Sequence, residues 1–345
     1  MNMRALRELD FEPAQIGSAE MVFAALASAE DRLSRLDERA RSCGFTEGWR
    51  DRADVRAAIA AMAIVGELVH PEDLILHDLG GDIRVPDPAV MLARRVLLAR
   101  RKARQGGAEL LSWGGMAWLA GLGRQAPPPG ARPTARIEGA PAQHGAYAGL
   151  EACFGRLAKG DAESQRAGVE DCLGVLDVPD VPPLLMAAAL LEAWRLVDPV
   201  PRNRWLGALA AAVFLQAAGR FSAGLFPLEV AFRRRAMPPR LAWAGLAERL
   251  VFWLGTMELA ADLELDELTR LGHKKALIER KAAGGRRSNR APDLAALAVA
   301  APAMTTESIA RALGITPQAS LQLVRRMGGA LQEITGRSRF RVWRL

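Results

Sequence analysis

Residues 306–327 read TESIARALGITPQASLQLVRRM, and this stretch decides the fold predicted for the C-terminal end of the chain. Apolar residues recur at helical spacing at Ile309, Ala310 and Leu313. Gly314 ends this first helix, because glycine adopts a left-handed backbone conformation without a steric cost. Thr316 is placed to cap a second helix, and Pro317 suits its first position, where a missing N–H does no harm. The stretch therefore predicts two short helices joined by a tight turn.

The second of these helices has one packing face and one polar, basic face. The packing face consists of Ser320, Leu323, Val324 and Met327. The opposite face carries Gln318, Leu321, Gln322, Arg325 and Arg326. A helix with such a face can enter the major groove of DNA, where base edges offer hydrogen-bond donors and acceptors. We therefore predict DNA contacts from Thr316, Gln318, Gln322, Arg325 and Arg326.

Residues 331–345 read LQEITGRSRFRVWRL, which predicts two short strands around Gly336. In the second strand, every other residue is an arginine: Arg337, Arg339 and Arg341. Because successive side chains of a strand point to opposite faces, one face can pack while the other presents guanidinium groups. We therefore predict a wing whose arginines grip DNA phosphates, and a winged helix-turn-helix as the C-terminal domain.

The positive charge of the chain is concentrated at the same end. From His273 onward there are fourteen Lys or Arg against four Asp or Glu, whereas the rest of the chain has thirty-two basic and thirty-five acidic residues. Charge gathered beside a groove-sized helix is an electrostatic signal of nucleic-acid binding. Other roles stay open, because helix-turn-helix units also serve in dimerisation or docking and hairpin arginines are often only solvated. The basic run at residues 273–290 is either a solvated tether or a further phosphate contact.

The composition predicts a mainly α protein with more than one domain. A chain of 345 residues fits two or three domains, and half of its residues are apolar. Residues 181–219 are the most apolar and predict a buried hairpin of two helices. Four tryptophans in helical patterns are expected in the core: Trp194, Trp205, Trp243 and Trp253. The predicted boundaries are an N-terminal helical domain at 1–123, a Gly/Pro-rich linker at 124–145, a helical domain at 146–285 and the winged helix-turn-helix at 286–345.

Cysteine usage and hydropathy predict a soluble, cytoplasmic protein. Cys43, Cys153 and Cys172 form no CxxC pair, which indicates buried free thiols in a reducing cytosol. No basic-then-apolar leader opens the chain. The longest apolar run, at residues 205–215, is shorter than the roughly 20 residues that cross a bilayer. We therefore expect no membrane association.

The C-terminal string resembles that of a known family. Residues 315–342, ITPQASLQLVRRMGGALQEITGRSRFRV, are similar to the winged helix that follows many Fic-domain proteins, which share an -EITGRxRxRV- string. In the central hairpin, Asp198-Pro199-Val200 stands where the Fic signature has His-Pro-Phe. Asn203-Arg204-Trp205-Leu206-Gly207 lies over its Asn-Gly-Arg-x-Gly. The resemblance implies a helical body with a Fic-like core.

A second resemblance covers nearly the full length of the chain. The string GELVHPEDLILHD at residues 66–78 resembles an uncharacterised alphaproteobacterial family of helix-turn-helix proteins, often plasmid-borne, that is marked by GELVHxEDLxLHD. The stretch around it also resembles the inhibitory helix of Fic proteins. In that comparison Ala61 stands in place of a serine and Val65 in place of a glutamate.

The departures from the Fic signature predict a degenerate site. Fic proteins transfer a nucleotide onto a hydroxyl, with a histidine as base and a glycine-rich turn around the phosphates. Asp198 is a weaker base than an imidazole, and its charge would repel a triphosphate. Arg204 replaces the glycine that approaches phosphate, and Trp205 replaces the clamping arginine. We therefore predict no catalytic residue and no nucleotidyl transfer from a degenerate loop that contains Asp198, Asn203, Arg204 and Gly207.

No cofactor or metal site is predicted. His70 and His77 could share a helix face, but Pro71 interrupts that helix and the three or four ligands of a zinc site are missing. The acidic residues nearby lack the spacing of a calcium loop, and we expect them to be solvated or paired with arginine: Glu67, Glu72, Asp73, Asp78 and Asp82. No glycine motif for a dinucleotide or for a P-loop is present.

These observations favour a DNA-binding protein that is not an enzyme, and specifically a transcriptional regulator. The expected partner is double-stranded DNA, and a homodimer on two half-sites would be typical of the class. Two alternatives remain. One is a Fic-related nucleotidyltransferase with a modified active site. The other is an antitoxin-like or plasmid-maintenance component whose helical body binds a protein partner.

Overall fold

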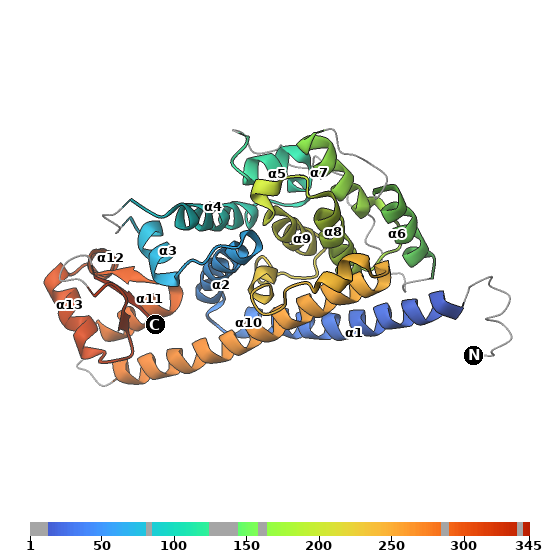
Figure 1. The fold of residues 1–345 in the computed structure, drawn as a ribbon. Coiled ribbons are helices and arrows are strands. Elements are labelled where there is room, and N and C mark those ends of the chain that lie inside the picture. The colour runs from blue at the N-terminus through green and yellow to red at the C-terminus, as the bar shows by residue number, and fades with distance from the viewer. Residues whose placement is uncertain (1–12, 81–84, 124–143, 158–163, 284–289, 337–340) are drawn as a thin grey trace. The chain divides into compact units, whose positions relative to one another are not determined.

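The computed structural model describes residues 13–80, 85–123, 144–157, 164–283, 290–336 and 341–345. Within these residues the chain is mainly helical and its strands are short (Figure 1), which confirms the predicted fold class. The chain forms two compact units, each assembled from separate segments. The first unit consists of residues 1–34, 106–221 and 234–259, and the second of residues 35–105, 222–233 and 260–345. The domain boundaries drawn from composition stay a prediction.

The first unit is built around a hairpin of two apolar helices. Its helices are α5 (Trp113–Leu119), α6 (His144–Leu157), α7 (Gln165–Gly174), α8 (Pro183–Val197), α9 (Leu206–Ala217) and the first parts of α1 (Pro13–Ser42) and α10 (Leu246–Ala283). α8 packs against α9, α6 and α7. Residues 184–194 of α8 and 206–215 of α9 are all buried. The predicted hairpin is therefore confirmed, since helices that are apolar all round belong in a core.

A buried carboxylate interrupts this apolar core. Glu192 of α8 is fully buried and accepts hydrogen bonds from Arg195 at 2.6 and 2.9 Å. The indole Nε1 of Trp253 donates to the same carboxylate at 3.0 Å, and the Nε of Arg249 lies 2.6 Å from it. A buried charge is tolerated when it is paired and hydrogen-bonded. These partners therefore let Glu192 join α8 to the first part of α10.

The second unit combines helices from both ends of the chain. Its elements are α2 (Thr46–Ala61), α3 (Pro71–Asp78), α4 (Pro88–Ala103), the 3-10 helix η5 (Leu228–Ala231), the last part of α10, α11 (Ala291–Ala300), α12 (Thr306–Leu313), α13 (Pro317–Arg326) and three strands. α2 packs against α3, α4, η5 and α11. Pro71 is the first residue of α3, where no N–H is needed, so His70 lies outside the helix that carries His77 and the predicted interruption is confirmed.

The fully buried Arg100 of α4 joins three of these segments. Its guanidinium donates to Asp54 of α2 at 2.9 Å and to both carboxylate oxygens of Glu229 of η5 at 2.9 and 3.0 Å. It also donates to the carbonyl of Leu225 at 3.1 Å. Burial raises the pKa of Glu229, and the cation of Arg100 acts against that rise. Because each charge has a partner, the cluster can be buried between helices.

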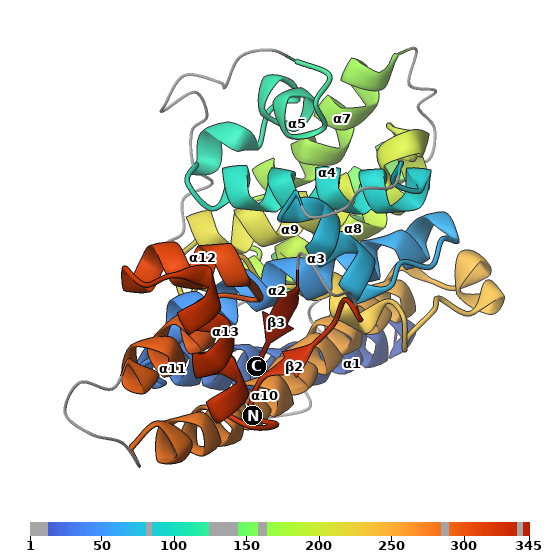
Figure 2. The ribbon, with the colours of Figure 1, turned by 90° about the vertical axis from the view of Figure 1, so that its left-hand side faces the viewer.

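The C-terminal segment follows the order helix, strand, helix, helix, strand, strand. β1 (Met304–Thr305), β2 (Gln332–Glu333) and β3 (Val342–Arg344) form an antiparallel sheet in the order β1-β3-β2. Figure 2 shows β2 and β3 beside α13 and the last part of α10. Met304 and Glu333 lie opposite Trp343 from its two sides, and Val342 and Trp343 are buried. The two helices predicted from residues 306–327 are confirmed as α12 and α13.

Arg52 of α2 terminates the first helix of this segment. Its Nη1 donates to the carbonyl of Val299 at 2.7 Å, and its Nη2 donates to those of Ala298 at 2.7 Å and Ala301 at 2.6 Å. These are carbonyls at the end of α11, which have no partner inside the helix. Burial lowers the pKa of Arg52 to about 10, so the guanidinium remains charged at neutral pH. Gly48 allows this close approach, because a Cβ there would lie 2.0 Å from the oxygen of Val299.

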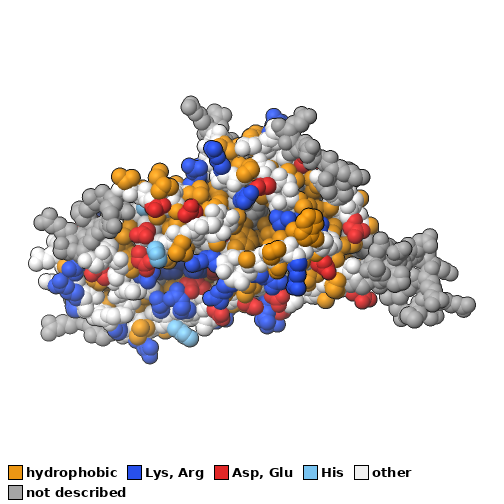
Figure 3. Space-filling model, viewed as in Figure 1, with side chains coloured by type: hydrophobic (Ala, Val, Ile, Leu, Met, Phe, Trp, Pro, Cys, Tyr) orange, Lys and Arg blue, Asp and Glu red, His pale blue; other side chains and the backbone are white. Residues whose placement is uncertain are grey.

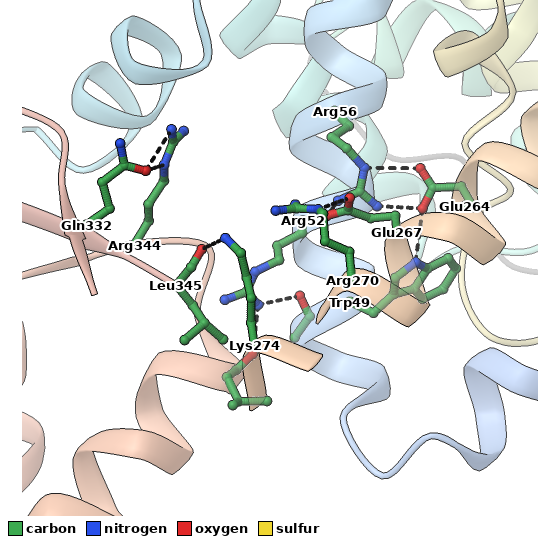
Figure 4. A network of polar contacts seen from close by, with 12 residues as sticks. Trp49, Arg52, Arg56, Glu264, Glu267, Arg270, Lys274, Gln332, Arg344 and Leu345 are labelled. Carbon is green, nitrogen blue, oxygen red and sulfur yellow. Dashed lines mark hydrogen bonds and ion pairs between the residues drawn. The ribbon is translucent and has the colours of Figure 1, made fainter. Parts of the chain in front are cut away.

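Further polar contacts connect the C-terminal segment to the other helices of the second unit (Figure 4). Arg344 of β3 pairs with Glu72 of α3 at 2.9 Å. The ammonium of Lys274, on α10, donates to the carbonyl of Leu345 at 2.8 Å. Elsewhere on α10, Glu264 accepts hydrogen bonds from Trp49 and Arg56 of α2. The helix-turn-helix is thus held by α2, α3 and α10.

The cysteines, the linker and the membrane-spanning potential were also the subject of predictions. None of the three cysteines forms a disulfide; Cys153 and Cys172 are buried, as expected, whereas Cys43 is only half-buried. Burial raises the pKa of the Cys172 thiol, which keeps it in the unreactive protonated form. The linker predicted around residues 124–143 lies outside the described residues. Among the helices that are described, none is both long and apolar enough to cross a bilayer.

The contacts of Arg52 predict a large effect on stability. Replacing Arg52 with methionine should lower the free energy of unfolding by about 3 kcal/mol, because several buried carbonyls would lose their donor. Arg290→Met is the matched control, since Arg290 lies before the first turn of α11 and makes an exposed ion pair with Asp293. Such pairs contribute about 0–1 kcal/mol. Urea unfolding followed by circular dichroism measures both. Equal stabilities of the two variants would contradict the role given to Arg52.

Candidate nucleic-acid interface

The exposed face of α13 carries the polar side chains predicted to face DNA. Thr316, Gln318, Gln322, Arg325 and Arg326 are all exposed. Apart from the hydrogen bond that Thr316 accepts as helix cap, none of these side chains has a hydrogen-bond or ion-pair partner among the described residues. The residues of the opposite face, Ser320, Leu323, Val324 and Met327, are buried as predicted. The division of α13 into a packed face and an available face is therefore confirmed.

The buried hydroxyl of Ser320 fixes α13 against α12. Its Oγ lies 3.0 Å from the carbonyl of Thr306, at the start of α12, and 2.9 Å from that of Pro317. The turn between the two helices takes the predicted form, with Gly314 at φ +62° and the Thr316 hydroxyl accepting from the N–H of Ala319 at 3.2 Å. α12 itself begins with a capping box. The angle at which α13 presents its exposed face is thus set by specific contacts.

In the described part of the hairpin that follows α13, the arginine side chains are less exposed than those of α13. Arg341 is about one-quarter exposed, and its Nε lies 3.9 Å from the carboxylate of Glu333. Arg337 and Arg339, the other two arginines of the predicted wing, lie outside the described residues. Arg344, which the sequence did not single out, is held by Glu72 and by the side chain of Gln332. Arg344 therefore serves the packing of the hairpin.

Other basic side chains are exposed near Arg325 and Arg326 of α13 in the C-terminal segment. Figure 3 shows Lys and Arg side chains over the last part of α10 and over the C-terminal helices. Arg311, in the last turn of α12, is exposed and was not predicted; its place between Ile309 and Leu313, on the polar side of the helix, is the signal that could have found it. The described part of the basic run, up to residue 283, is helix, and Lys281 donates to the carbonyl of Gly328 just after α13.

The turn between α8 and α9 in the first unit is closed by an ion pair. Asp198 ends α8 in a left-handed conformation, at φ +44°. The Nε of Arg204 lies 3.1 and 3.0 Å from its two carboxylate oxygens, and Nη2 lies 2.5 Å from one of them. The hydrogen bond with Asp198 raises the pKa of Arg204. The carboxylate of Asp198 is therefore already bonded to a guanidinium of the same loop.

Gly207, at the start of α9, packs directly against a tryptophan ring. A Cβ at Gly207 would lie 2.6 Å from Cγ of Trp194, so the indole of α8 fills the space that a side chain would need. Asn203 is buried, and its Oδ1 has no partner among the residues that the structure describes. The structure thus brings Asp198 and Arg204 together as a bonded pair, and it places Gly207 against a ring.

The acidic and histidine side chains around residues 67–82 form no metal site among the described residues. Asp78 pairs with Arg101 at 2.8 Å and lies 3.6 Å from Arg94, so part of the acidic cluster is matched by arginine. No group of three or more His, Cys, Asp or Glu side chains converges within the described ranges. Asp82 falls outside those ranges. The core position expected for Trp243 is wrong: it ends the 3-10 helix η6 (Pro239–Trp243) and is 92% exposed.

Comparisons with known proteins give two matching families. The model described as "HTH DNA binding domain" matches residues 291–345, and the one described as "Protein of unknown function (DUF1612)" matches residues 171–283. The uncharacterized protein y4cF of Sinorhizobium fredii is 30% identical over 359 residues, which cover 90% of this chain and 93% of that protein. A Fic family protein from Desulfovibrio desulfuricans has a crystal structure similar to this one with a TM-score of 0.46. That comparison has 14% identity and covers 97% of this chain and 96% of the other.

The contact between Gly207 and Trp194 predicts opposite effects for two glycine substitutions. Gly207→Ala should lower the free energy of unfolding by about 1–3 kcal/mol, because the added methyl overpacks the hairpin. Gly174→Ala is the control, since a Cβ at the end of α7 meets nothing within 4 Å. That substitution should be neutral or raise stability by up to about 1 kcal/mol. Thermal unfolding measures both, and a Gly207→Ala protein as stable as the parent would contradict this packing role.

Proposed function

This chain belongs to the family of the Sinorhizobium fredii protein y4cF, and we propose that it acts as a transcriptional regulator that reads double-stranded DNA with α13. The chain carries a helix-turn-helix DNA-binding domain at residues 291–345. The observation that carries the proposal is the exposed face of α13: Gln318, Gln322, Arg325 and Arg326 have no side-chain partner among the described residues, while the opposite face is packed.

The residue types on this face suit base recognition. A glutamine amide can bond the N6 and N7 positions of adenine, and an arginine can bond guanine or a phosphate. Gln318 and Gln322 are four residues apart, so they lie one helical turn apart on the same face. Gln318 is near the N-terminus of α13, the end that commonly meets the bases. We assign base readout to these glutamines, and groove or backbone contact to Arg325 and Arg326.

The hairpin would act as a wing beside this helix. Arg337, Arg339 and Arg341 alternate along the sequence toward β3, and we propose that they contact phosphates. The concentration of charge supports this role, because the sequence from His273 onward has fourteen basic against four acidic residues. Exposed Arg311 adds to the same positive surface. Such backbone contacts provide affinity and orientation rather than sequence preference.

We further propose that the first unit is not catalytic. The support comes from the loop between α8 and α9, where Asp198 is bonded to Arg204 and Gly207 is packed on Trp194. A carboxylate whose oxygens already accept hydrogen bonds from a guanidinium has fewer lone pairs left to meet a substrate hydroxyl. The first unit would then serve assembly or sensing.

The DNA-binding proposal predicts two classes of variant. Arg325→Ala and Arg326→Ala should weaken binding to every duplex and reduce the slope of log K against log salt by about one unit for each phosphate that is no longer neutralised. Gln318→Ala and Gln322→Ala should change sequence preference more than general affinity. Fluorescence anisotropy with labelled duplexes at several salt concentrations measures both effects.

Arg166→Ala is the control for these variants, since Arg166 is an exposed arginine of α7 in the first unit. Its binding curves should overlay those of the parent protein. If the α13 variants also bind every duplex with parental affinity and slope, the assignment of α13 as the reading helix is wrong.

The non-catalytic assignment predicts no transfer of nucleotide. Incubation with labelled ATP and candidate protein targets should leave no label on the chain or on the targets, because no free base stands at the start of the loop. Mass spectrometry of the same samples detects any adduct without a label. Transfer that is abolished by Asp198→Ala would overturn the assignment.

A further inference from the structure

Trp243 is a large apolar side chain left almost fully in solvent. It ends η6, just before α10 begins, and 92% of its surface is exposed. Met21 of α1, which lines the same surface hollow, is 50% exposed. Tryptophan contributes more contact energy to protein interfaces than most residues, and a surface position of this kind is typical of a binding anchor. The exposure of Trp243 thus points to a partner.

A hollow of about 560 Å³ lies beside Trp243 in the first unit. Its apolar lining comes from Met21, Leu241, Trp243, Ala244 and Val251. Figure 3 shows hydrophobic side chains grouped near the beginning of α10, the part of the chain where most of these residues lie. A hollow of this volume is large enough to receive an indole ring. The same face therefore offers a projecting ring and a space that can receive one.

Two charged side chains of opposite sign border the hollow. Arg240 and Glu248 both line it, and both are exposed. Neither has an ion-pair or hydrogen-bond partner within the described part of the chain, and they do not pair with each other. A face with one unpaired cation and one unpaired anion is complementary to a copy of itself that is turned by a two-fold rotation. In that arrangement Arg240 of each copy lies opposite Glu248 of the other.

We propose that this face is the contact between two copies of the chain. A two-fold interface uses the same patch on both subunits, so each residue must find its complement within that patch. The patch of Trp243, its hollow, Arg240 and Glu248 meets this requirement. The indole of each copy enters the hollow of the other, where the Met21 thioether contacts it. The charged pairs form the polar rim of a hydrophobic centre.

The proposed dimer adds an oligomeric state to the DNA-binding function proposed for the single chain. Helix-turn-helix proteins that dimerise read two half-sites of a palindromic operator. The dimer is measured without DNA, so its presence or absence does not depend on whether α13 reads bases.

Sedimentation velocity of the full chain over a concentration series tests the proposal. The parent protein should dimerise, and Trp243→Ala should raise the dimer Kd by about tenfold or more, the change that corresponds to removal of an interface anchor. Val85→Ala is the matched control, because Val85 is 94% exposed, belongs to the second unit and is not among the residues that line the hollow. It should leave the Kd unchanged. Circular dichroism should show the same fold for both variants, since neither side chain is buried.

A charge exchange distinguishes this face from a nonspecific apolar contact. Arg240→Glu and Glu248→Arg should each weaken the dimer, because each places like charges opposite each other. The double variant Arg240→Glu/Glu248→Arg should restore the parental Kd. A parent protein that stays monomeric throughout the series overturns the proposal, as does a dimer that Trp243→Ala leaves unchanged. A dimer weakened by both single reversals without rescue in the double variant also overturns the reciprocal pairing.

Discussion

The cap that Arg52 provides for α11 is the interaction on which the account of DNA binding depends. A single guanidinium of α2 satisfies the carbonyls of Ala298, Val299 and Ala301, which would otherwise have no partner at the end of the helix. Gly48 makes the approach of the two backbones possible. Because α11 is the first helix of the C-terminal segment, this contact ties the C-terminal segment to the rest of the second unit. Arg344 with Glu72, and Lys274 with Leu345, secure the same segment at its other end.

This attachment fixes the orientation of the exposed face of α13 within the second unit. Ser320 sets the angle between α12 and α13, and α11 packs against both helices. The proposed base readout by Gln318 and Gln322 would require such precision, because a groove contact depends on the position of a few side-chain atoms. In the first unit, the loop between α8 and α9 is closed by internal contacts: Asp198 bonds to Arg204, and Gly207 packs on Trp194. The proposed reading helix α13 and the loop between α8 and α9 therefore lie in different units.

The local parts of this structure could be predicted from the sequence, whereas the long-range contacts could not. Gly314, Thr316 and the apolar spacing of α13 act over a few residues, so their pattern alone specified the two helices. The pairing of Arg52 with carbonyls nearly 250 positions away leaves no sequence pattern. Trp243 was misplaced in the core because its helical spacing was read without the prolines that make η6 a short, separate turn. The likeness of Asp198 and Arg204 to a signature motif likewise gave no hint that they bond to each other.

Hydrogen–deuterium exchange of the full chain, with and without a saturating DNA duplex, tests the central claim most directly. The account predicts that DNA slows exchange in the peptides that contain residues 317–326, and leaves the loop at residues 198–207 unchanged. Slowing that is confined to the first unit, or none in α13 while the duplex is bound, would contradict it.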